Sequence, residues 1–165
     1  MTLPHTTAGV QALWAEARPD LDTSPMAVVG PLKRIQRLLA AATEPLYDGA
    51  PLTAPELDVL IKLRHTAEPV IARRLAESMS CSPAAISKTL AKLERRRFIE
   101  RRASPADRRA ALVTCTDSGS SAVDALFPCQ LAVEAELLAG LGADRERVIE
   151  ALNLLAAVLE RNLRS

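Results

Sequence analysis

Residues 82–94 read Ser-Pro-Ala-Ala-Ile-Ser-Lys-Thr-Leu-Ala-Lys-Leu-Glu, and this stretch decides the fold. Ser82 is a good helix N-cap, and Pro83 suits the first helical position because it has no N–H to leave unpaired. The apolar positions then repeat at helical spacing, at Ile86, Leu90 and Leu93. We therefore predict an amphipathic helix from 83 to about 96 that buries this face.

The opposite face of this helix is small and polar over its first half. At 100° per residue, Lys88 and Arg95 lie on the side opposite the buried face. Since Ser82, Ala84 and Ser87 are small, the helix can sit deep in a major groove of duplex DNA, with its positive N-terminal end near phosphates. We expect Ser87 and Lys88 to contact base edges.

Two further helices precede this one. Residues 71–78, Ile-Ala-Arg-Arg-Leu-Ala-Glu-Ser, predict a short helix, and the tight connection 79–81 joins it to the next as a helix-turn-helix. Thr53 and Glu56 have the spacing of a capping box, which predicts a helix over 54–65.

Two strands joined by a polar turn follow. Residues 98–101 (Phe-Ile-Glu-Arg) and 110–115 (Ala-Ala-Leu-Val-Thr-Cys) favour strands, and the turn 103–107 between them would close a hairpin. We therefore predict a mainly α fold with a small β-hairpin wing. The winged helix-turn-helix, a DNA-binding domain, would span 53–119.

The N-terminal part carries an apolar stripe of its own. Residues 1–24 predict a short helix and a loop, and Ser24 followed by Pro25 predicts the start of a dimerisation or linker helix over 25–47. Gly30-Pro31 and Pro45 should kink or end this helix. Its stripe consists of Val28, Leu32, Ile35, Leu39, Ala42 and Leu46.

The C-terminal segment, 120–165, carries a second stripe. A cap over 116–119 starts a helix in which Pro128 should introduce a bend, and Asp144 caps a last helix. The apolar positions of that helix have the 4,3,4 spacing of helices that pack together, at Val148, Leu152, Leu155 and Leu159. A single chain of this size would not cover both stripes, so we predict a homodimer.

Positive charge is concentrated in the winged segment. Residues 88–109 hold nine Lys or Arg and three Asp or Glu, a net charge of +6, so the other residues carry −5 within the chain's total of +1. Such a basic region on an acidic body suits the phosphates of nucleic acid. The alternative is an ordinary solvated charged face.

Composition argues against several other classes. No apolar run approaches the roughly 18 residues that span a bilayer, and the N-terminus does not resemble a signal peptide, so we expect a cytoplasmic protein without a membrane partner. The three cysteines have no close pair, and with two histidines they predict neither a disulfide nor a metal site. Because no phosphate loop or nucleophile–base pair is visible, we expect no cofactor and no enzyme.

Taken together, these motifs resemble the multiple-antibiotic-resistance regulator (MarR) family over about 25–163. The most specific motif is Asp107-Arg-Arg109 followed by Val113-x-x-Thr-x-x-Gly119. The resemblance implies a transcription regulator that dimerises through interlocked terminal helices and places two recognition helices in successive major grooves of a pseudo-palindromic operator. It also implies that the wing tip enters a minor groove, where Arg109 approaches the bases and Asp107 braces it.

The chain departs from the family pattern at two positions. Arg97 stands where the family usually has Gly, so a residue with a Cβ must end the recognition helix, at the cost of a left-handed conformation. Cys115 replaces the usual Leu. The candidate contacts with double-stranded DNA are Ser82, Ala84, Ser87, Lys88, Lys92, Arg101, Asp107, Arg108 and Arg109.

A small-molecule effector is also expected. Residues 14–26 are similar to an N-terminal extension in the urate-responsive branch of the family, which implies a small anionic effector reached by Trp14 and Arg95. Asp58 either lines the same cleft, between the dimerisation and DNA-binding lobes, or is a surface carboxylate. Trp14 could instead belong to a core. The leading hypothesis is a repressor that a small anionic or aromatic ligand releases from DNA.

Two other functions stay open at this point. Cys81 precedes a helix N-terminus, a place where the pKa of a thiol can fall, so a redox-responsive regulator is one alternative; Cys115 and Cys129 are the other thiols to consider. The second alternative is a winged helix that binds only protein. Its outer helix face would be acidic or apolar, whereas this face is basic.

Overall fold

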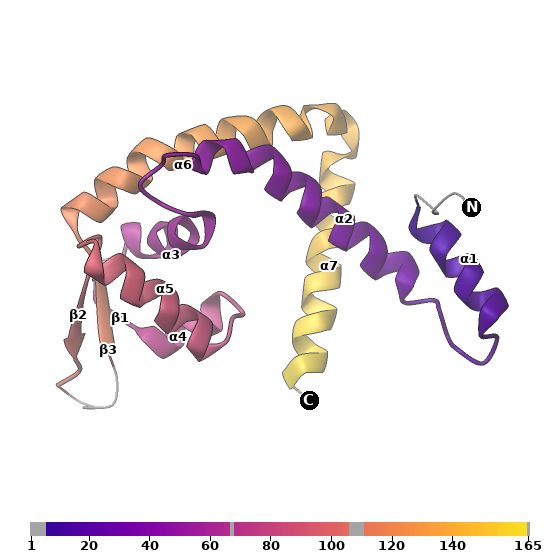
Figure 1. The fold of residues 1–165 in the computed structure, drawn as a ribbon, viewed down its shortest axis with the longest axis horizontal. Coiled ribbons are helices and arrows are strands. Elements are labelled where there is room, and N and C mark those ends of the chain that lie inside the picture. The colour runs from indigo at the N-terminus through magenta and orange to yellow at the C-terminus, as the bar shows by residue number, and fades with distance from the viewer. Residues whose placement is uncertain (1–5, 67, 106–110, 165) are drawn as a thin grey trace. The chain divides into compact units, whose positions relative to one another are not determined.

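A computed structural model of the chain describes residues 6–66, 68–105 and 111–164. The described elements are mainly helical, with one small antiparallel sheet (Figure 1), which confirms the predicted fold class. The chain divides into two compact units, Met1–Gln130 and Leu131–Ser165. In chain order the elements are α1 (Thr7–Ala17), α2 (Met26–Thr43), the 3₁₀ helix η1 (Glu44–Tyr47), α3 (Ala54–Arg64), β1 (Val70–Ile71), α4 (Ala72–Ser78), α5 (Pro83–Arg95), β2 (Ile99–Ala103), β3 (Ala111–Cys115), α6 (Asp117–Leu138), the 3₁₀ helix η2 (Ala139–Asp144) and α7 (Arg145–Arg164).

The sheet contains the predicted hairpin and one strand that was not predicted. β2 pairs antiparallel with β3, from Ile99 opposite Cys115 to Ala103 opposite Ala111. β1 is only two residues long and pairs with the other edge of β3, so the strand order is β1-β3-β2. The wing is therefore anchored to the segment just before α4.

A single buried cluster holds the winged domain together. It takes side chains from α3, α4, α5, the sheet and the first turns of α6, which are grouped in Figure 1. The three apolar positions of α5 are all within it, as predicted. Its members are Leu52, Leu57, Val59, Leu60, Leu63, Leu75, Ala76, Ile86, Leu90, Leu93, Ile99, Val113, Ala122 and Val123.

The start of α3 confirms the predicted capping box. The Glu56 carboxylate accepts hydrogen bonds from the backbone N–H of Thr53 at 2.8 Å and from its hydroxyl at 3.0 Å. This satisfies a donor that a helix N-terminus leaves unpaired.

The start of α2 differs from the prediction. The helix begins at Met26, directly after Pro25, and no side-chain hydrogen bond caps it. The Ser24 N–H donates to the Asp22 carboxylate at 2.9 Å, which forms a turn in the preceding loop. Pro31 lies inside α2 without ending it. A proline removes one hydrogen bond of the helix, and the remaining turns continue to Thr43, just before Pro45.

α6 begins as the sequence predicts. The Thr116 hydroxyl accepts a hydrogen bond from the Gly119 N–H at 3.1 Å, and α6 then runs through Pro128 to Leu138. The stretch Asp117–Leu163 is long and apolar enough to cross a membrane by length and composition alone, which the sequence analysis did not anticipate. Helices that cover one another in soluble proteins have the same composition.

The unit Leu131–Ser165 has no buried side chain among its described residues. α7 begins at Arg145, directly after the predicted cap Asp144, whose carboxylate accepts a hydrogen bond from Arg147 at 2.7 Å. Five large apolar side chains of α7 are exposed, namely Ile149, Leu152, Leu154, Leu159 and Leu163. Val148, Leu155 and Val158 are half-buried.

Candidate nucleic-acid interface

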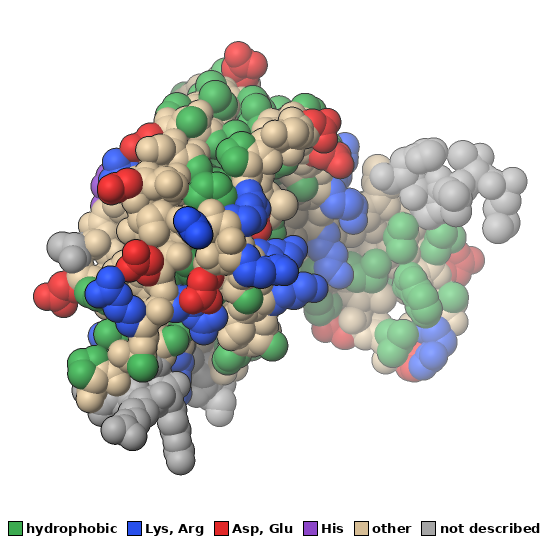
Figure 2. Space-filling view, turned by 60° about the vertical axis from the view of Figure 1, so that its left-hand side comes forward, with side chains coloured by type: hydrophobic (Ala, Val, Ile, Leu, Met, Phe, Trp, Pro, Cys, Tyr) green, Lys and Arg blue, Asp and Glu red, His purple; other side chains and the backbone are tan. Residues whose placement is uncertain are grey.

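The outer face of α5 carries the predicted DNA-contacting residues. Ser82, Ala84, Ser87, Lys88 and Lys92 are all exposed, while the opposite face of the helix is in the core. Figure 2 shows that Lys and Arg side chains gather on the side of the molecule that holds the winged domain, with acidic side chains between them. The predicted orientation of the helix is therefore confirmed.

Ser82 has a structural role in addition to any contact with DNA. Its side-chain oxygen accepts a hydrogen bond from the Ala85 N–H at 3.2 Å, as an N-cap does. The hydroxyl proton is still available for donation to a phosphate oxygen. Ser82 can thus fix the start of α5 and face an anion at the same time.

The cations of the winged domain differ in how they are paired. Within the described ranges, Lys88, Lys92 and Arg95 form no ion pair with an acidic side chain. By contrast, Arg101 lies 3.6 Å from Glu94, and Arg102 lies 2.8 Å from Glu100. Among these described residues, the cations of α5 are therefore more available to a phosphate than Arg101 and Arg102.

Arg96 pairs with a buried carboxylate, although its own side chain is 40% exposed. Its guanidinium donates a hydrogen bond to the Glu56 carboxylate at 3.0 Å and lies 5.0 Å from the centre of the Phe98 ring. Burial raises the pKa of Glu56, but the hydrogen bonds from Thr53 and the charge of Arg96 outweigh it and hold the pKa below its ordinary value. Sequence reasoning did not find this pair, since the two residues are 40 positions apart.

Arg97 ends the recognition helix in the left-handed conformation that the sequence predicts, with φ at 59°. Its N–H donates to the Glu94 carbonyl at 2.9 Å, and its carbonyl accepts from the Thr116 hydroxyl at 2.8 Å. The first bond closes the end of α5, and the second fixes it to the loop that leaves the wing. They hold a residue with a Cβ in a conformation that favours glycine.

Three of the predicted contacts, Asp107, Arg108 and Arg109, lie outside the described residues. Their place in a minor groove stays a prediction. Arg101 is described, and its side chain is 27% exposed in its pairing with Glu94.

The structure does not bring the three predicted effector residues together in one cavity of the single chain. Trp14 lies on α1 with 49% of its surface exposed, so it is not a core residue here, and Asp58 is exposed on α3. Arg95 lines a cavity of about 400 Å³ with Thr53, Glu56, Lys92 and Arg96. The effector pocket therefore stays a prediction.

The thiols are not bonded to one another. Cys81 and Cys115 are half-buried and Cys129 is exposed, and all three are free. Among the described residues no group of His, Cys, Asp or Glu side chains has the arrangement of a metal site.

A helix-turn-helix with an exposed basic second helix, backed by a three-stranded wing, defines the class: a winged helix-turn-helix DNA-binding protein. The sequence model of the MarR family matches residues 52–111, the same domain. Over these residues the chain is similar to the MarR family. It is a transcription regulator that binds DNA.

The comparisons extend beyond the winged domain. The chain is 26% identical over 141 residues to the HTH-type transcriptional regulator PecS of Dickeya dadantii. The aligned region covers 84% of this chain and 85% of that regulator.

Two solved structures show the same fold. One is PcaV of Streptomyces coelicolor in complex with its natural ligand, at 22% identity and a TM-score of 0.70, covering 83% of this chain and 95% of PcaV. The other is the complex of MepR of S. aureus with DNA, at 19% identity and a TM-score of 0.71, covering 81% of this chain and 97% of MepR.

Proposed function

We propose that the chain is a sequence-specific regulator that binds double-stranded DNA as a homodimer on a pseudo-palindromic operator. The observation that carries this proposal is the outer face of α5, where Ser87, Lys88 and Lys92 are exposed on a helix whose other face is locked in the core. Small residues near its N-terminus permit close approach to base edges, and the cations suit phosphates. MepR, which shares the fold, has been solved with DNA.

The exposed apolar side chains outside the winged domain support the homodimer. They lie on α1, α2, α6 and α7, which contribute few side chains to the buried cluster. Exposed apolar surface of this extent is typical of an interface. A second copy is the natural occupant, because two-fold symmetry also presents two recognition helices to a palindrome. The side chains include Leu13, Val28, Ile35, Leu38, Leu131, Leu137, Ile149, Leu152 and Leu159.

We also propose that the regulator is a repressor and that a small anionic or aromatic ligand releases it from DNA. PcaV, a structural relative, is solved with its natural ligand. Such a ligand releases DNA only if it binds the free conformation more tightly than the DNA-bound one, with a typical coupling of about 1 to 3 kcal/mol. Because the regulator must reach an operator, we propose that it acts in the cytoplasm without a membrane partner.

The test combines selection of bound sites from random duplex DNA with sedimentation at micromolar protein concentration. We expect a two-fold symmetric consensus with half-sites about one helical turn apart, and the mass of a dimer. Recovery of random sequence, or the mass of a monomer, would contradict the proposal. A thermal-shift screen of small aromatic acids, followed by operator titration, tests the ligand response.

A further inference from the structure

The helix α6 begins in the winged domain and ends in the second compact unit. It runs as one helix from Asp117 to Leu138 (Figure 1), while the boundary between the two units falls after Gln130. The buried residues of α6 all lie in its first two turns, and they are Gly119, Ala122 and Val123. The core of the winged domain therefore holds only the start of α6.

A proline weakens α6 just after its last buried residue. Because Pro128 has no N–H, the Asp124 carbonyl lacks the hydrogen bond that residue 128 donates in a regular helix, and the proline ring crowds that carbonyl. This turn is therefore the place where α6 bends most easily. A cavity of about 180 Å³ lies beside it, lined by Ile61 and Arg64 of α3 and by Phe127 and Pro128 of α6. Since a void offers no packing atoms, apolar contact alone does not fix the helix here.

The first contact that holds this region joins α3 to α6. Arg64, the last residue of α3, donates hydrogen bonds from Nε and Nη2 to the two carboxylate oxygens of Asp124, at 2.9 and 2.7 Å. Paired hydrogen bonds of this kind fix an orientation as well as a distance. The hydrogen bond from Arg64 holds the pKa of Asp124 below its ordinary value, so the carboxylate is charged at neutral pH.

The second contact lies beyond the proline. The Tyr47 hydroxyl, at the end of η1, donates a hydrogen bond to the Oε1 of Gln130 at 2.7 Å. The ring of Tyr47 packs against the buried cluster of the winged domain. The last residue of the first unit is thus tied to the core of that unit by a side chain 83 positions away in the sequence.

These two contacts, which we call the α6 contacts, lie on either side of Pro128 and on different faces of the helix. Asp124 and Gln130 are six residues apart, so they point about 120° apart around α6. Together they oppose both bending and rotation. The segment from Pro128 to Leu138 is about 15 Å long, so a bend of about 15° at Pro128 would move its end by about 4 Å, close to the rise of one base pair.

We propose that the α6 contacts position the winged domain for operator recognition, by fixing the direction of α6 across Pro128 and with it the half-site spacing that the homodimer accepts. This inference rests on the proposed function. Arg64, Asp124 and Tyr47 act through α6 and do not touch DNA. Exposed ion pairs add little to stability, so their loss should change the spacing preference more than the fold.

The test uses the operator recovered by site selection, two versions with one base pair added or removed between the half-sites, and a duplex with a single half-site. Each is titrated with the full-length protein by fluorescence anisotropy. Wild type should bind the altered spacings about tenfold or more weakly, since the DNA or the protein must deform to fit. In the double variant Tyr47→Phe, Asp124→Asn this penalty should fall to about threefold, and binding of the selected operator should weaken about fivefold, because a less rigid dimer loses preorganisation. Its binding of the single half-site should equal that of wild type.

Asp20→Asn is the matched control. Asp20 also accepts two hydrogen bonds from one guanidinium, that of Arg18, but the two residues are neighbours in the loop after α1 and join no distant elements. This variant should show the spacing preference of wild type. Tyr47→Phe keeps its ring in the core and Asp124→Asn keeps its size, so both variants should fold, which urea unfolding checks.

Three outcomes would overturn the inference while the proposed function stands. They are an affinity of wild type that does not depend on spacing, a spacing penalty in the double variant equal to that of wild type, and an equal loss of affinity for the single half-site and the full operator. The last would mean that the winged domain itself is damaged. If the double variant does not fold, Tyr47→Phe alone decides, and an unchanged penalty overturns the inference. Failure of wild type to select any operator would instead remove the proposed function, and this inference with it.

Discussion

The guanidinium of Arg96 lies 3.0 Å from the carboxylate of Glu56, which is only 3% exposed, and this pair joins the end of the recognition helix α5 to the capping box of α3. Glu56 also receives both hydrogen bonds from Thr53. One carboxylate therefore fixes a helix start and the orientation of the DNA-reading helix. Removing the charge of Glu56 should therefore destabilise both the start of α3 and the end of α5.

Glu56→Gln should lower the free energy of unfolding by about 1 to 3 kcal/mol, because a buried group loses charge-assisted hydrogen bonds. Glu77→Gln is a matched control, since Glu77 also pairs with an arginine, Arg73, at 3.0 Å, but both side chains are exposed. The control should change stability by less than about 0.5 kcal/mol. Urea unfolding followed by circular dichroism measures both, and equal losses would contradict a special role for the buried pair.

Acid should destabilise the protein partly through Glu56. Its pKa in the folded state is below its ordinary value of 4.5, so the folded state binds fewer protons than the unfolded state in this range. The stability it contributes is present above that ordinary value and is lost as the pH falls through the folded pKa. Thermal melts from about pH 6 to pH 3 should decline less steeply in Glu56→Gln than in wild type. Parallel declines would contradict this assignment.

Arg97→Gly should raise the free energy of unfolding by up to about 1 kcal/mol. Arg97 has a φ of 59°, where a side chain is strained and glycine is not, while the entropy lost by glycine on folding offsets part of the gain. Both backbone bonds of Arg97 are kept in the variant. Arg74→Gly, in the interior of α4, should have the opposite sign and cost about 1 kcal/mol. The two variants are compared by urea unfolding, and destabilisation by Arg97→Gly would contradict the strain.

The winged domain could be predicted from sequence because its signals are local. The caps at Thr53 and Ser82 and the spacing of the core positions on α5 each depend on a few neighbouring residues. The left-handed conformation of Arg97 followed instead from the resemblance to a family that usually has glycine there. These signals gave the helices of the domain and the orientation of α5, and hence the exposed candidates for DNA contact.

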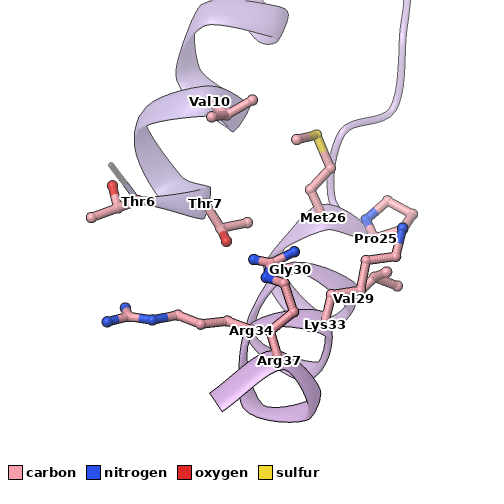
Figure 3. Close-up of a pocket in the computed structure, with 10 residues that line it drawn as sticks. All are labelled: Thr6, Thr7, Val10, Pro25, Met26, Val29, Gly30, Lys33, Arg34 and Arg37. Atoms are coloured by element: carbon pink, nitrogen blue, oxygen red, sulfur yellow. The ribbon is translucent and has the colours of Figure 1, made fainter. Parts of the chain in front are cut away.

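Features that depend on distant pairing could not be found in this way. β1 is two residues long, too short for any alternation, and forms only because Val70 meets Val113 in the folded chain. Ser24 looked like a cap, but α2 begins after Pro25 without a side-chain cap bond, and the Ser24 N–H donates to Asp22. The cavity between α1 and α2 that Arg37 lines (Figure 3) has only a weak signal in the sequence, the absence of Asp and Glu from Met26 to Thr43. The cavity itself forms only because α1 packs against Gly30.

Lys88→Ala should weaken operator binding by about 1 to 3 kcal/mol and relax sequence preference at one base pair, if Lys88 contacts a base edge as proposed. The slope of the logarithm of affinity against the logarithm of salt, over roughly 50 to 200 mM, should fall by about one counterion per subunit if it contacts a phosphate instead. Arg145→Ala, with the same loss of charge on α7, is the control. Fluorescence anisotropy with labelled operator measures both, and wild-type binding by Lys88→Ala at every salt concentration would exclude Lys88 from the interface.

Gly119, in the first turn of α6, lies against the backbone just before β2. A Cβ there would lie 2.1 Å from the carbonyl oxygen of Phe98 and 2.9 Å from the Sγ of Cys115. That carbonyl accepts a hydrogen bond from the Thr116 N–H at 3.1 Å, so it is held in place by the same turn that caps α6. The obstruction is backbone, which no change of rotamer relieves.

Gly119→Ala should therefore destabilise the protein by about 1 to 3 kcal/mol, since α6 must move away from β2 and the Phe98–Thr116 bond is lengthened. Gly140→Ala is the matched control, because a Cβ at Gly140 meets no atom within 4 Å and its φ is not positive. It should be neutral or stabilise slightly, through the reduced freedom of the unfolded chain. Urea unfolding of the two variants checks the difference. If Gly119→Ala is as stable as Gly140→Ala, the glycine is not required by this contact, and the junction between wing and α6 must be looser than the structure shows.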